Sequence, residues 1–309
     1  MRSGIVTLIG RPNVGKSSLL NALIGRKLSI VSHKPQTTRN AIQGVLHSQG
    51  DQVVFVDTPG LHMQAKKALN RAMNDAAASA LHDIDLAVFV VEAQRWTEED
   101  EAVLERLKRM QAPVGLVINK VDRISNKSEL LPEMEAMSAR GEFVFVMPLS
   151  ATKGDNVQTL AQEILGRMPE GPPLYPADMV AGFDNGFLAA ELIREKLTRT
   201  LHQELPYSLN VSIESYEIEP PRKRGGAPAE PGKGGGLHRI SAVVWVERDS
   251  QKSIVIGDGG SALKKVGTAA RKELEVLLGT KVFLQVWCRV RENWSDDPKA
   301  LKQFGFSGD

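Results

Sequence analysis

The sequence predicts two domains: an α/β domain with a mostly parallel sheet and helices on both faces, then a smaller α+β domain. The chain has 309 residues, about twice the usual length of one domain. Strand patterns alternate with helical patterns over residues 1–168, which is typical of parallel α/β sheets. Four prolines then occur within Pro169–Pro176, where neither a helix nor a strand continues. We therefore expect an interdomain linker there.

The first domain should alternate strands with crossover helices. Short β-branched and apolar runs predict strands at Ile5–Ile9, Ile42–His47, Val53–Val56, Leu86–Val91, Val114–Ile118 and Phe143–Met147. Helical periodicity begins near Lys16, Lys66, Glu98, Lys127 and Asn156. Parallel strands require such crossovers, and the helices then cover both faces of the sheet.

The second domain follows a different order of elements. We take residues 1–168 as the first domain, 169–184 as the Pro-rich linker, and 185–309 as the second domain with its C-terminal tail. A segment at 219–236 holds six glycines and four prolines and is predicted to be a mobile hairpin insertion. The remaining patterns predict a helix at Phe187–Gln203, strands at Leu209–Tyr216, Leu237–Glu247 and Lys281–Val290, and two helices flanking Gly257–Gly260.

The composition is that of a globular protein. Hydrophobic residues make up 42% and charged residues 25%, which excludes collagen-like and wholly disordered chains. The single cysteine, Cys288, cannot form an internal disulfide, and no charged, apolar leader precedes the first strand. A reducing, cytosolic setting is therefore expected. The longest apolar runs, such as Leu86–Val91, are far shorter than the roughly 18 residues that a membrane helix needs.

The net charge of +2 conceals an uneven distribution. Between Pro220 and Leu301 there are 15 Lys and Arg residues against 9 Asp and Glu residues, so this region has an excess of +6 and the rest of the chain −4. A basic region attached to an acidic body indicates a polyanionic partner for the C-terminal part.

A phosphate-binding loop is the strongest motif. Residues Gly10-Arg11-Pro12-Asn13-Val14-Gly15-Lys16-Ser17-Ser18 follow a predicted strand and open a predicted helix, and they match the G-x-x-x-x-G-K-[ST] pattern. The glycines let backbone N–H groups face the phosphates. Lys16 would neutralise the β- and γ-phosphates, and the Ser17 hydroxyl would ligate Mg²⁺. A purely structural glycine turn is a weak alternative in this context.

Three further groups lie at the ends of later strands, where ligands of open α/β sheets bind. In Asp57-Thr58-Pro59-Gly60, the Asp can hold the Mg²⁺ shell and the Gly N–H can meet the γ-phosphate. In Asn119-Lys120-Val121-Asp122, the Asp carboxylate matches the two adjacent N–H donors that guanine presents and adenine lacks. In Ser150-Ala151, the Ala N–H can meet the guanine O6, although this pair is commonplace.

On these motifs the sequence resembles the translation-factor-related GTPases and, within them, the Era family, over essentially its whole length. The resemblance implies a P-loop GTPase domain that binds GTP or GDP with Mg²⁺. Pro35-Gln36-Thr37-Thr38-Arg39 resembles the first switch, with the γ-phosphate and Mg²⁺ role placed on Thr38 and Thr37 left as the alternative. Residues 57–62 resemble the second switch. Without the resemblance, the Thr pair would be read as a helix cap or a polar loop.

Leu61 bears on the mechanism. It follows Gly60, at the place where Ras-like enzymes carry the glutamine that orients the attacking water. A Leu side chain can neither orient water nor transfer a proton. The resemblance to cation-activated relatives implies Asn13 as a ligand to K⁺ beside the β- and γ-phosphates. We expect slow, K⁺-dependent turnover, with Lys16, Thr38, Asn13 and Gly60 as the catalytic residues.

The G-x-x-G segment Gly257-Asp258-Gly259-Gly260 lies between two predicted helices, which resembles a type II KH module. RNA contacts are expected from this loop and from Lys252, Ile256, Lys264 and Lys265. Taken alone, the loop could be a tight helix–helix turn and the lysines a solvated helix face. Asp258 departs from the basic or amide residue that is usual in this loop, and its carboxylate should weaken phosphate contact.

The tryptophans of the second domain are assigned mainly to packing. Trp245 and Trp287 alternate with apolar neighbours and are expected in the core. Packing of the C-terminal tail is favoured over base stacking for Trp294. Cys288 lies in the middle of a predicted strand and is expected to be inert.

The resemblance implies a GTP-hydrolysing switch that binds 16S ribosomal RNA near its 3′ end and acts in assembly of the small (30S) ribosomal subunit. It also implies a monomer in the cytoplasm with peripheral association with the inner membrane. The alternative is an RNA-binding scaffold with structural GTP and negligible hydrolysis. Leu61 is compatible with this alternative because a Leu side chain does not orient the attacking water. A metabolic P-loop kinase is disfavoured by the Asn119–Asp122 motif.

Overall fold

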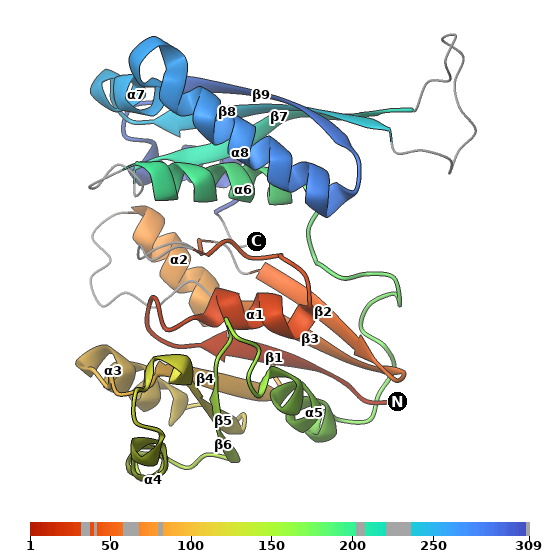
Figure 1. Ribbon diagram of the computed structural model, residues 1–309, viewed down its shortest axis with the longest axis vertical. Helices are drawn as coiled ribbons and strands as arrows, with labels where there is room; N and C mark the ends of the chain where they lie inside the picture. Colours follow the sequence, from red (N-terminus) through yellow and green to blue (C-terminus); the bar gives the residue numbers. More distant parts are fainter. Residues whose placement is uncertain are drawn as a thin grey trace. The chain divides into compact units, whose positions relative to one another are not determined.

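The computed structural model describes residues 1–31, 38–39, 42–57, 68–79, 83–201, 208–220 and 236–306. By its internal contacts the chain divides into two compact units. The first comprises Met1–Gly182 with Gly305–Asp309, and the second comprises Phe183–Phe304. Each unit contains its own sheet, and Figure 1 labels the elements of both.

The first unit is built on a six-stranded sheet in the order β2-β3-β1-β4-β5-β6. All neighbouring strands pair in parallel except β2, which pairs antiparallel with β3. This confirms the predicted mostly parallel α/β fold. The strands are β1 (Ser3–Ile9), β2 (Ile42–Ser48), β3 (Asp51–Asp57), β4 (Leu86–Glu92), β5 (Val114–Asn119) and β6 (Phe145–Leu149).

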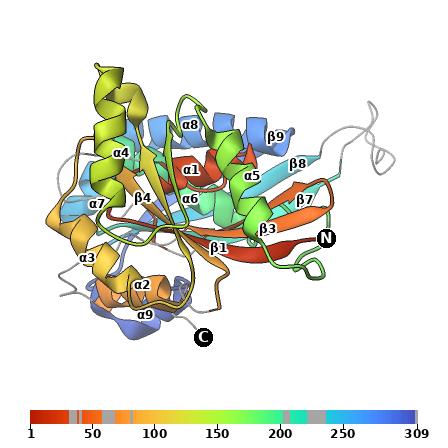
Figure 2. The ribbon, with the colours of Figure 1, turned by 90° about the horizontal axis from the view of Figure 1, so that it is seen from below.

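Helices cover both faces of this sheet. Figure 2 shows α1 and α5 beside each other on one face, with α2 and α3 on the other. On the α3 face, Val103, Leu104 and Leu107 pack against a layer that includes Phe89 and Ile118. Every residue of β4 is buried, because a central parallel strand is covered on both sides. The helices are α1 (Lys16–Ile24), α2 (Ala68–Ser79), α3 (Glu98–Leu107), α4 (Leu130–Ser138) and α5 (Val157–Arg167).

Two elements of the first unit, the last strand and the helix after β5, begin two or three residues later than predicted. The last strand begins at Phe145 rather than Phe143, because pairing with β5 starts at Gly115 opposite Phe145. Phe143 instead packs against the α3 core. The helix predicted near Lys127 begins at Leu130, after a short 3₁₀ turn over Lys127–Glu129.

The segment after α5 forms neither a helix nor a long strand, but it is tied to the first unit. Gln52 is buried, and its Oε1 accepts hydrogen bonds from the N–H groups of Leu174 (2.7 Å) and Tyr175 (2.9 Å). The Val45 N–H donates to the carbonyl of Val180 at 2.9 Å. Residues 169–182 therefore follow the β2–β3 side of the sheet as an anchored strap.

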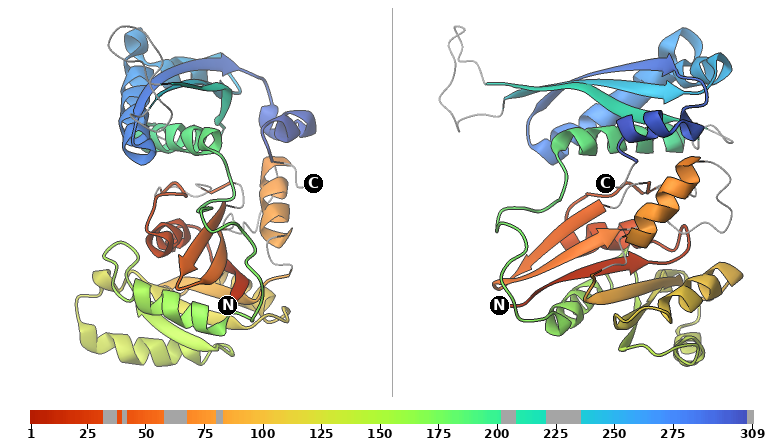
Figure 3. Two further views of the ribbon diagram at one scale, coloured as in Figure 1. Left: turned by 90° about the vertical axis from the view of Figure 1, so that its right-hand side faces the viewer. Right: turned by 180° about the vertical axis from the view of Figure 1, so that it is seen from behind.

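The second unit is a three-stranded sheet with helices on one face. β8 (Leu237–Val246) lies in the centre, antiparallel to β7 (Asn210–Glu219) and parallel to β9 (Lys281–Val290). Figure 3 shows α6 and α8 on one face of this sheet. This is the predicted α+β KH architecture. The helices are α6 (Asn185–Thr200), α7 (Asp249–Ile256), α8 (Ser261–Leu278) and α9 (Pro298–Gln303), with a 3₁₀ turn η5 (Trp294–Asp296) before α9.

The predicted insertion at 219–236 falls between β7 and β8. Its first residue, Glu219, belongs to β7 and pairs with Leu237 of β8, so the hairpin extends further than predicted. Residues 221–235 lie outside the described residues.

The tryptophans of the second unit differ in burial. Trp294 is fully buried and its Nε1 donates to the Ser208 carbonyl at 3.2 Å, so it packs in the interior. Trp287 is 41% exposed, and its assignment to the core was wrong. The reason is that β9 is an edge strand and Trp287 lies on the face away from the helices. Within the described ranges, none of the helices is both long enough and apolar enough to cross a membrane.

Candidate nucleotide site and RNA groove

The phosphate loop joins β1 to α1, and its glycines are required by close packing. A Cβ atom on Gly15 would lie 2.3 Å from Asn119 Nδ2, and one on Gly10 would lie 2.3 Å from the Val90 carbonyl oxygen. Gly15 also caps α1 in the left-handed conformation, at φ 105°. Lys16 is the first residue of the helix, so the loop leads directly into a helix N-terminus that favours anions.

Lys16 is held inside this loop. Its Nζ donates to the carbonyl oxygens of Gly10 at 2.8 Å and Arg11 at 3.0 Å, and the side chain is buried. Burial lowers the pKa of Lys16 to about 8, although the attraction of Asp57 acts in the opposite direction. Backbone carbonyls thus hold the ammonium group in the loop that the sequence motif predicts to bind the phosphates.

Three hydroxyl groups converge on Asp57 at the end of β3. Asp57 Oδ2 accepts hydrogen bonds from Ser17 Oγ at 2.7 Å, Ser29 Oγ at 3.0 Å and Thr38 Oγ1 at 3.4 Å. Ser17 Oγ and Thr38 Oγ1 are 2.9 Å apart. Burial raises the pKa of Asp57, and Lys16 and the three hydroxyls act against that rise.

The Asp57 group fits a hard divalent cation. Asp57 is fully buried, and among the described residues its Oδ1 has no hydrogen-bond partner. A buried carboxylate oxygen without a partner is costly unless a ligand completes it. One carboxylate with hydroxyl oxygens and substrate phosphates is the ligand set that Mg²⁺ uses. Ser29 was not predicted from the sequence, because nothing in its local pattern marks it.

The predicted switch residues are only partly described. Thr38 is buried beside Ser17, as the pairing above shows. Thr37, Thr58, Pro59, Gly60 and Leu61 lie outside the described residues.

Asn119 joins the phosphate loop to the predicted base-reading loops. It is 2% exposed, and its Nδ2 donates to the Val14 carbonyl at 2.8 Å. Its Oδ1 accepts from the Lys120 N–H at 2.8 Å and from the Ala151 N–H at 3.1 Å. The Ala151 N–H, predicted to face the guanine O6, therefore has Asn119 as its partner here.

Asp122 and Ser150 lie together at this end of the sheet. Ser150 Oγ donates to Asp122 Oδ1 at 2.6 Å, which orients the carboxylate. Lys120 Nζ donates to the Asn13 carbonyl at 2.6 Å, so the second motif also contacts the phosphate loop. Four predicted groups that are far apart in sequence thus meet at the carboxyl ends of β1, β3, β5 and β6.

The other predicted loop residues differ in exposure. Asn13 is exposed and has left-handed backbone at φ 65°, and Val14 is fully buried, so its side chain serves packing. Pro12 and Ser18 are half-buried.

The G-x-x-G loop of the second unit is a tight left-handed turn between α7 and α8. Gly257 ends α7 at φ 72°, and a Cβ there would lie 2.7 Å from Ala262 Cβ. Gly259 and Gly260 have φ 53° and 79°. Asp258 is exposed at the turn, as are Lys264 and Lys265 on α8, while Lys252 and Ile256 are half-buried.

A cavity of about 350 Å³ adjoins this loop, between α8 and β9. Leu263, Leu284 and Val286 form its apolar lining, and Lys264 and Arg271 lie at its basic side. Arg271 Nη1 is 3.2 Å from Glu275 Oε1. An apolar groove beside a glycine loop suits unstacked bases with a backbone pressed against the loop.

Comparison with known proteins places the chain in a family. A family model described as 50S ribosome-binding GTPase matches residues 5–120, and a KH domain model matches residues 229–295. GTPase Era of Yersinia pestis (strain Pestoides F) is 46% identical over 307 residues, covering 99% of this chain and 96% of the relative. GTPase Era of Yersinia pseudotuberculosis (strain IP 31758) matches equally. The chain belongs to the Era family of GTPases.

Two solved Era structures extend over the whole chain. One is a single-residue variant of Aquifex aeolicus Era bound to GDP.AlF4⁻, and the other is Era in complex with MgGDPNP and nucleotides 1506–1542 of 16S ribosomal RNA. Each is 36% identical, has a TM-score of 0.90 and covers 100% of both chains. This chain is accordingly an Era-family GTPase that hydrolyses GTP to GDP and phosphate.

A buried ion-pair network braces the phosphate loop of this Era-family protein. Arg11 Nη2 lies 3.1 Å from Glu92 Oε2, and Arg11 Nε lies 2.9 Å from Asp100 Oδ2. Lys120 Nζ lies 3.0 Å from the other oxygen of Glu92. Glu92 therefore links the phosphate loop to the predicted base-reading loop. The Arg11 side chain is paired with these two carboxylates, so the nucleotide contact predicted for Arg11 would come from its backbone N–H.

Asp100 was not predicted from the sequence as part of the site. It stands in the first turn of α3, where its Oδ2 also accepts from the N–H of Thr97 at 3.0 Å and from Thr97 Oγ1 at 2.9 Å. Thr97-x-x-Asp100 reads as an ordinary helix cap. Only the fold shows that the same carboxylate holds Arg11.

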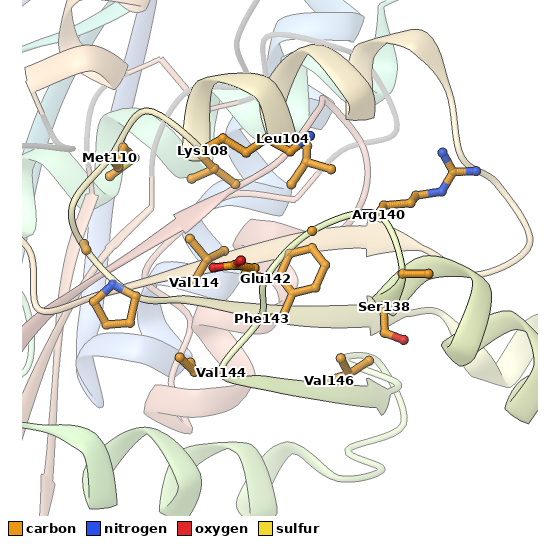
Figure 4. Close-up of a pocket in the computed structure, with 15 residues that line it drawn as sticks. Leu104, Lys108, Met110, Val114, Ser138, Arg140, Glu142, Phe143, Val144 and Val146 are labelled. Carbon is orange, nitrogen blue, oxygen red and sulfur yellow. The ribbon is translucent and has the colours of Figure 1, made fainter.

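A larger cavity of about 1000 Å³ lies at the opposite end of β5 from the nucleotide site. Leu104 of α3, Val114 of β5 and Phe143 are among its lining residues, and Figure 4 shows the Arg140 guanidinium extending away from it. Among the described residues, none of those predicted for the site lines this cavity.

Asp100→Asn should destabilise the protein and weaken GDP binding, because it leaves the buried Arg11 guanidinium with one charged partner. Breaking a buried pair of this kind costs about 3 kcal/mol of unfolding free energy. Denaturant unfolding and calorimetric titration with GDP measure both effects. Glu105→Gln, which removes an exposed pair with Lys108, is the control and should change neither. Equal effects of the two substitutions would contradict the role of the network.

Proposed function

We propose that this GTPase couples its nucleotide state to the binding of single-stranded RNA at the 3′ end of 16S ribosomal RNA. The observation that carries the proposal is one chain with a guanine-type nucleotide site in the first unit and a glycine loop beside an apolar, basic-rimmed groove in the second. The solved Era complex with nucleotides 1506–1542 of 16S ribosomal RNA supports the choice of RNA. Residues 1–168 serve the nucleotide and residues from 185 onward serve the RNA.

The nucleotide roles follow from the site. Lys16 neutralises the β- and γ-phosphates, with backbone N–H groups of the loop Gly10–Ser18 around them, Pro12 excepted because proline has no N–H. Ser17, Thr38 and Asp57 hold Mg²⁺, which supplies charge neutralisation at the phosphates when bound. Asp122, oriented by Ser150, accepts the two N–H groups of guanine. Thr58, Pro59 and Gly60 complete the γ-phosphate side.

The proposed conformational switch between the GTP and GDP states depends on Thr38 and Gly60. Both contact the γ-phosphate side in the GTP state, and its loss on hydrolysis releases them. Thr38 lies next to Ser17 and Asp57, the two other proposed Mg²⁺ ligands, so its release would act directly beside the metal site.

Asn13 is proposed as the K⁺ ligand. Its amide is exposed, and among the described residues no hydrogen bond to it is seen, while its carbonyl is held by Lys120 Nζ. A cation there supplies positive charge beside the phosphates, which compensates for Leu61 in place of a water-orienting side chain.

GTP turnover should be about tenfold or more faster in K⁺ than in Na⁺ at equal ionic strength, a difference of roughly 1.4 kcal/mol in barrier height. Asn13→Gly preserves the left-handed backbone and should abolish the difference. Phosphate release measured in both salts checks this. Equal wild-type rates in the two salts would exclude the K⁺ site.

The coupling itself is tested by single-turnover GTP hydrolysis with and without RNA of nucleotides 1506–1542. If RNA and GTP share a two-state element, saturating RNA should change the hydrolysis rate. RNA should also change the affinity for GTP by the same factor by which GTP changes the affinity for RNA. If this RNA does not bind, the proposed function is wrong. If the RNA binds but changes neither nucleotide binding nor hydrolysis, the proposed coupling is wrong.

Asp258→Lys should tighten RNA binding and steepen its salt dependence. The substitution exchanges a carboxylate for an ammonium group at the loop that approaches the phosphates, and each added phosphate contact steepens the log–log salt slope by about 0.7 for single strands. A titration over several salt concentrations measures it. Glu292→Lys makes the same charge change at an exposed residue after β9 and serves as the control. Identical behaviour of both variants would contradict a specific role for the loop.

On the family resemblance we further propose action in assembly of the small (30S) ribosomal subunit as a monomer, and peripheral association with the inner membrane. The positive excess between Pro220 and Leu301 supports attraction to polyanions of either kind. Co-sedimentation with 30S subunits and with vesicles of anionic phospholipid tests the two separately.

A further inference from the structure

The outward face of β9 exposes two aromatic rings. Successive strand residues point to opposite faces, so Lys281, Phe283, Gln285, Trp287 and Arg289 share one side, and all five are exposed. Phe283 is 42% and Trp287 41% exposed. The alternate residues, including Val282 and Cys288, pack in the core beneath α6 and α8. Large aromatic residues repeated on the open face of an edge strand point to a binding role rather than to packing.

Cations surround these rings. Arg239 of β8 pairs in register with Phe283, and its guanidinium carbon lies 5.0 Å from the ring centroid. Lys281 and Arg289 stand at the two ends of the same strand. The aromatic and cationic side chains are thus interleaved on one surface, which we call the β9 face.

The carboxylates paired with the two arginines of the β9 face come from β7 on the far side of the sheet, and Glu275 of α8 lies near Lys281. Glu219 forms an ion pair with Arg239, and Glu214 lies 2.6 Å from Arg289. These pairs are exposed and therefore weak, so a phosphate can compete for either guanidinium. The rings themselves lie on the strand furthest from these acids.

The β9 face lies on the other side of the strand that lines the groove beside the G-x-x-G loop. Leu284 and Val286 line the groove, and Phe283, Gln285 and Trp287 alternate with them on the other side of the same strand. β9 forms the edge of the sheet, with β8 on its one paired side. An RNA strand that leaves the groove across this edge would therefore reach the rings of Phe283 and Trp287. These two residues are about 13 Å apart along the strand.

The opposite end of the outward face is already covered. Trp245 of β8 packs 5.8 Å from Phe304, which follows α9, and its Nε1 donates to Ser212 Oγ at 2.8 Å. Trp245 therefore has a structural partner. Phe283 has a cation over its ring and Trp287 keeps much of its surface open.

We propose that the β9 face is a second stacking surface for single-stranded RNA, on which Phe283 and Trp287 stack with bases and Arg239, Lys281 and Arg289 contact phosphates. The proposal rests on the proposed RNA function and extends it, because the groove holds one stretch of RNA and the β9 face holds the next. Aromatic stacking accepts any base, so this surface adds affinity and length dependence more than sequence choice.

The test compares RNA lengths on the full chain. Trp287→Ala and Phe283→Ala should each weaken binding of RNA of nucleotides 1506–1542 by about 5- to 150-fold, the range for loss of one stacked base. Trp287→Phe should restore most of that affinity. A truncated RNA just long enough to fill the groove should bind all these variants like the wild type. Val276→Ala, at an 80% exposed residue of α8, is the control and should have no effect.

A spectroscopic measurement separates stacking from altered folding. RNA should quench tryptophan fluorescence of the wild type, and Trp287→Phe should remove most of the quenching while binding persists. Failure of the wild type to bind any of these RNAs would overturn the proposed function itself. Wild-type binding that is unchanged in both alanine variants at every RNA length would overturn the β9-face proposal and leave that surface to a protein partner.

Discussion

The nucleotide site depends on the side chain of Asn119, which holds three loops together at the carboxyl ends of the strands. One buried amide donates to the Val14 carbonyl and accepts from the N–H groups of Lys120 and Ala151. The phosphate loop, the base-reading loop and the loop after β6 therefore have fixed positions relative to one another. Gly15 must be a glycine for the same reason, because Asn119 Nδ2 occupies the space of its Cβ. A polar group that is buried and paired with three loops in this way favours one arrangement of them.

Charged groups at the phosphate end are held in position by other groups of the protein. Lys16 is held by two carbonyl oxygens, Asp57 by three hydroxyls, and Arg11 by two carboxylates. Burial opposes the charge on Lys16 and Asp57, as the directions of their pKa shifts show. A phosphate and a divalent cation relieve that opposition, since they restore partners to groups that water no longer reaches. Binding energy and catalytic positioning thus come from the same buried charges.

The sequence predicted the parts of the fold that local rules determine. The glycine spacing of residues 10–17 and the continuous apolar runs of central strands such as β4 are local signals, and the structure follows them. Contacts between distant residues leave no such signal. Arg11 and Asp100 are 89 positions apart, and Gln52 holds a strap more than a hundred residues away, so neither pairing could be predicted. Trp287 was misplaced because alternation does not say which face of an edge strand is covered.

From these contacts we expect Asn119 to act by tying loops together rather than by reading the base, and this role can be measured directly. Asn119→Asp keeps both acceptor bonds but sets a carboxylate oxygen against the Val14 carbonyl, so it removes one tie. The direct measurement is the Kd of this variant for GDP and for IDP, which lacks the 2-amino group, beside the wild type. We expect weakening of both by about 5- to 150-fold, the cost of one unmade buried hydrogen bond, with the GDP-to-IDP ratio unchanged. A changed ratio with little loss of GDP affinity would contradict the tying role.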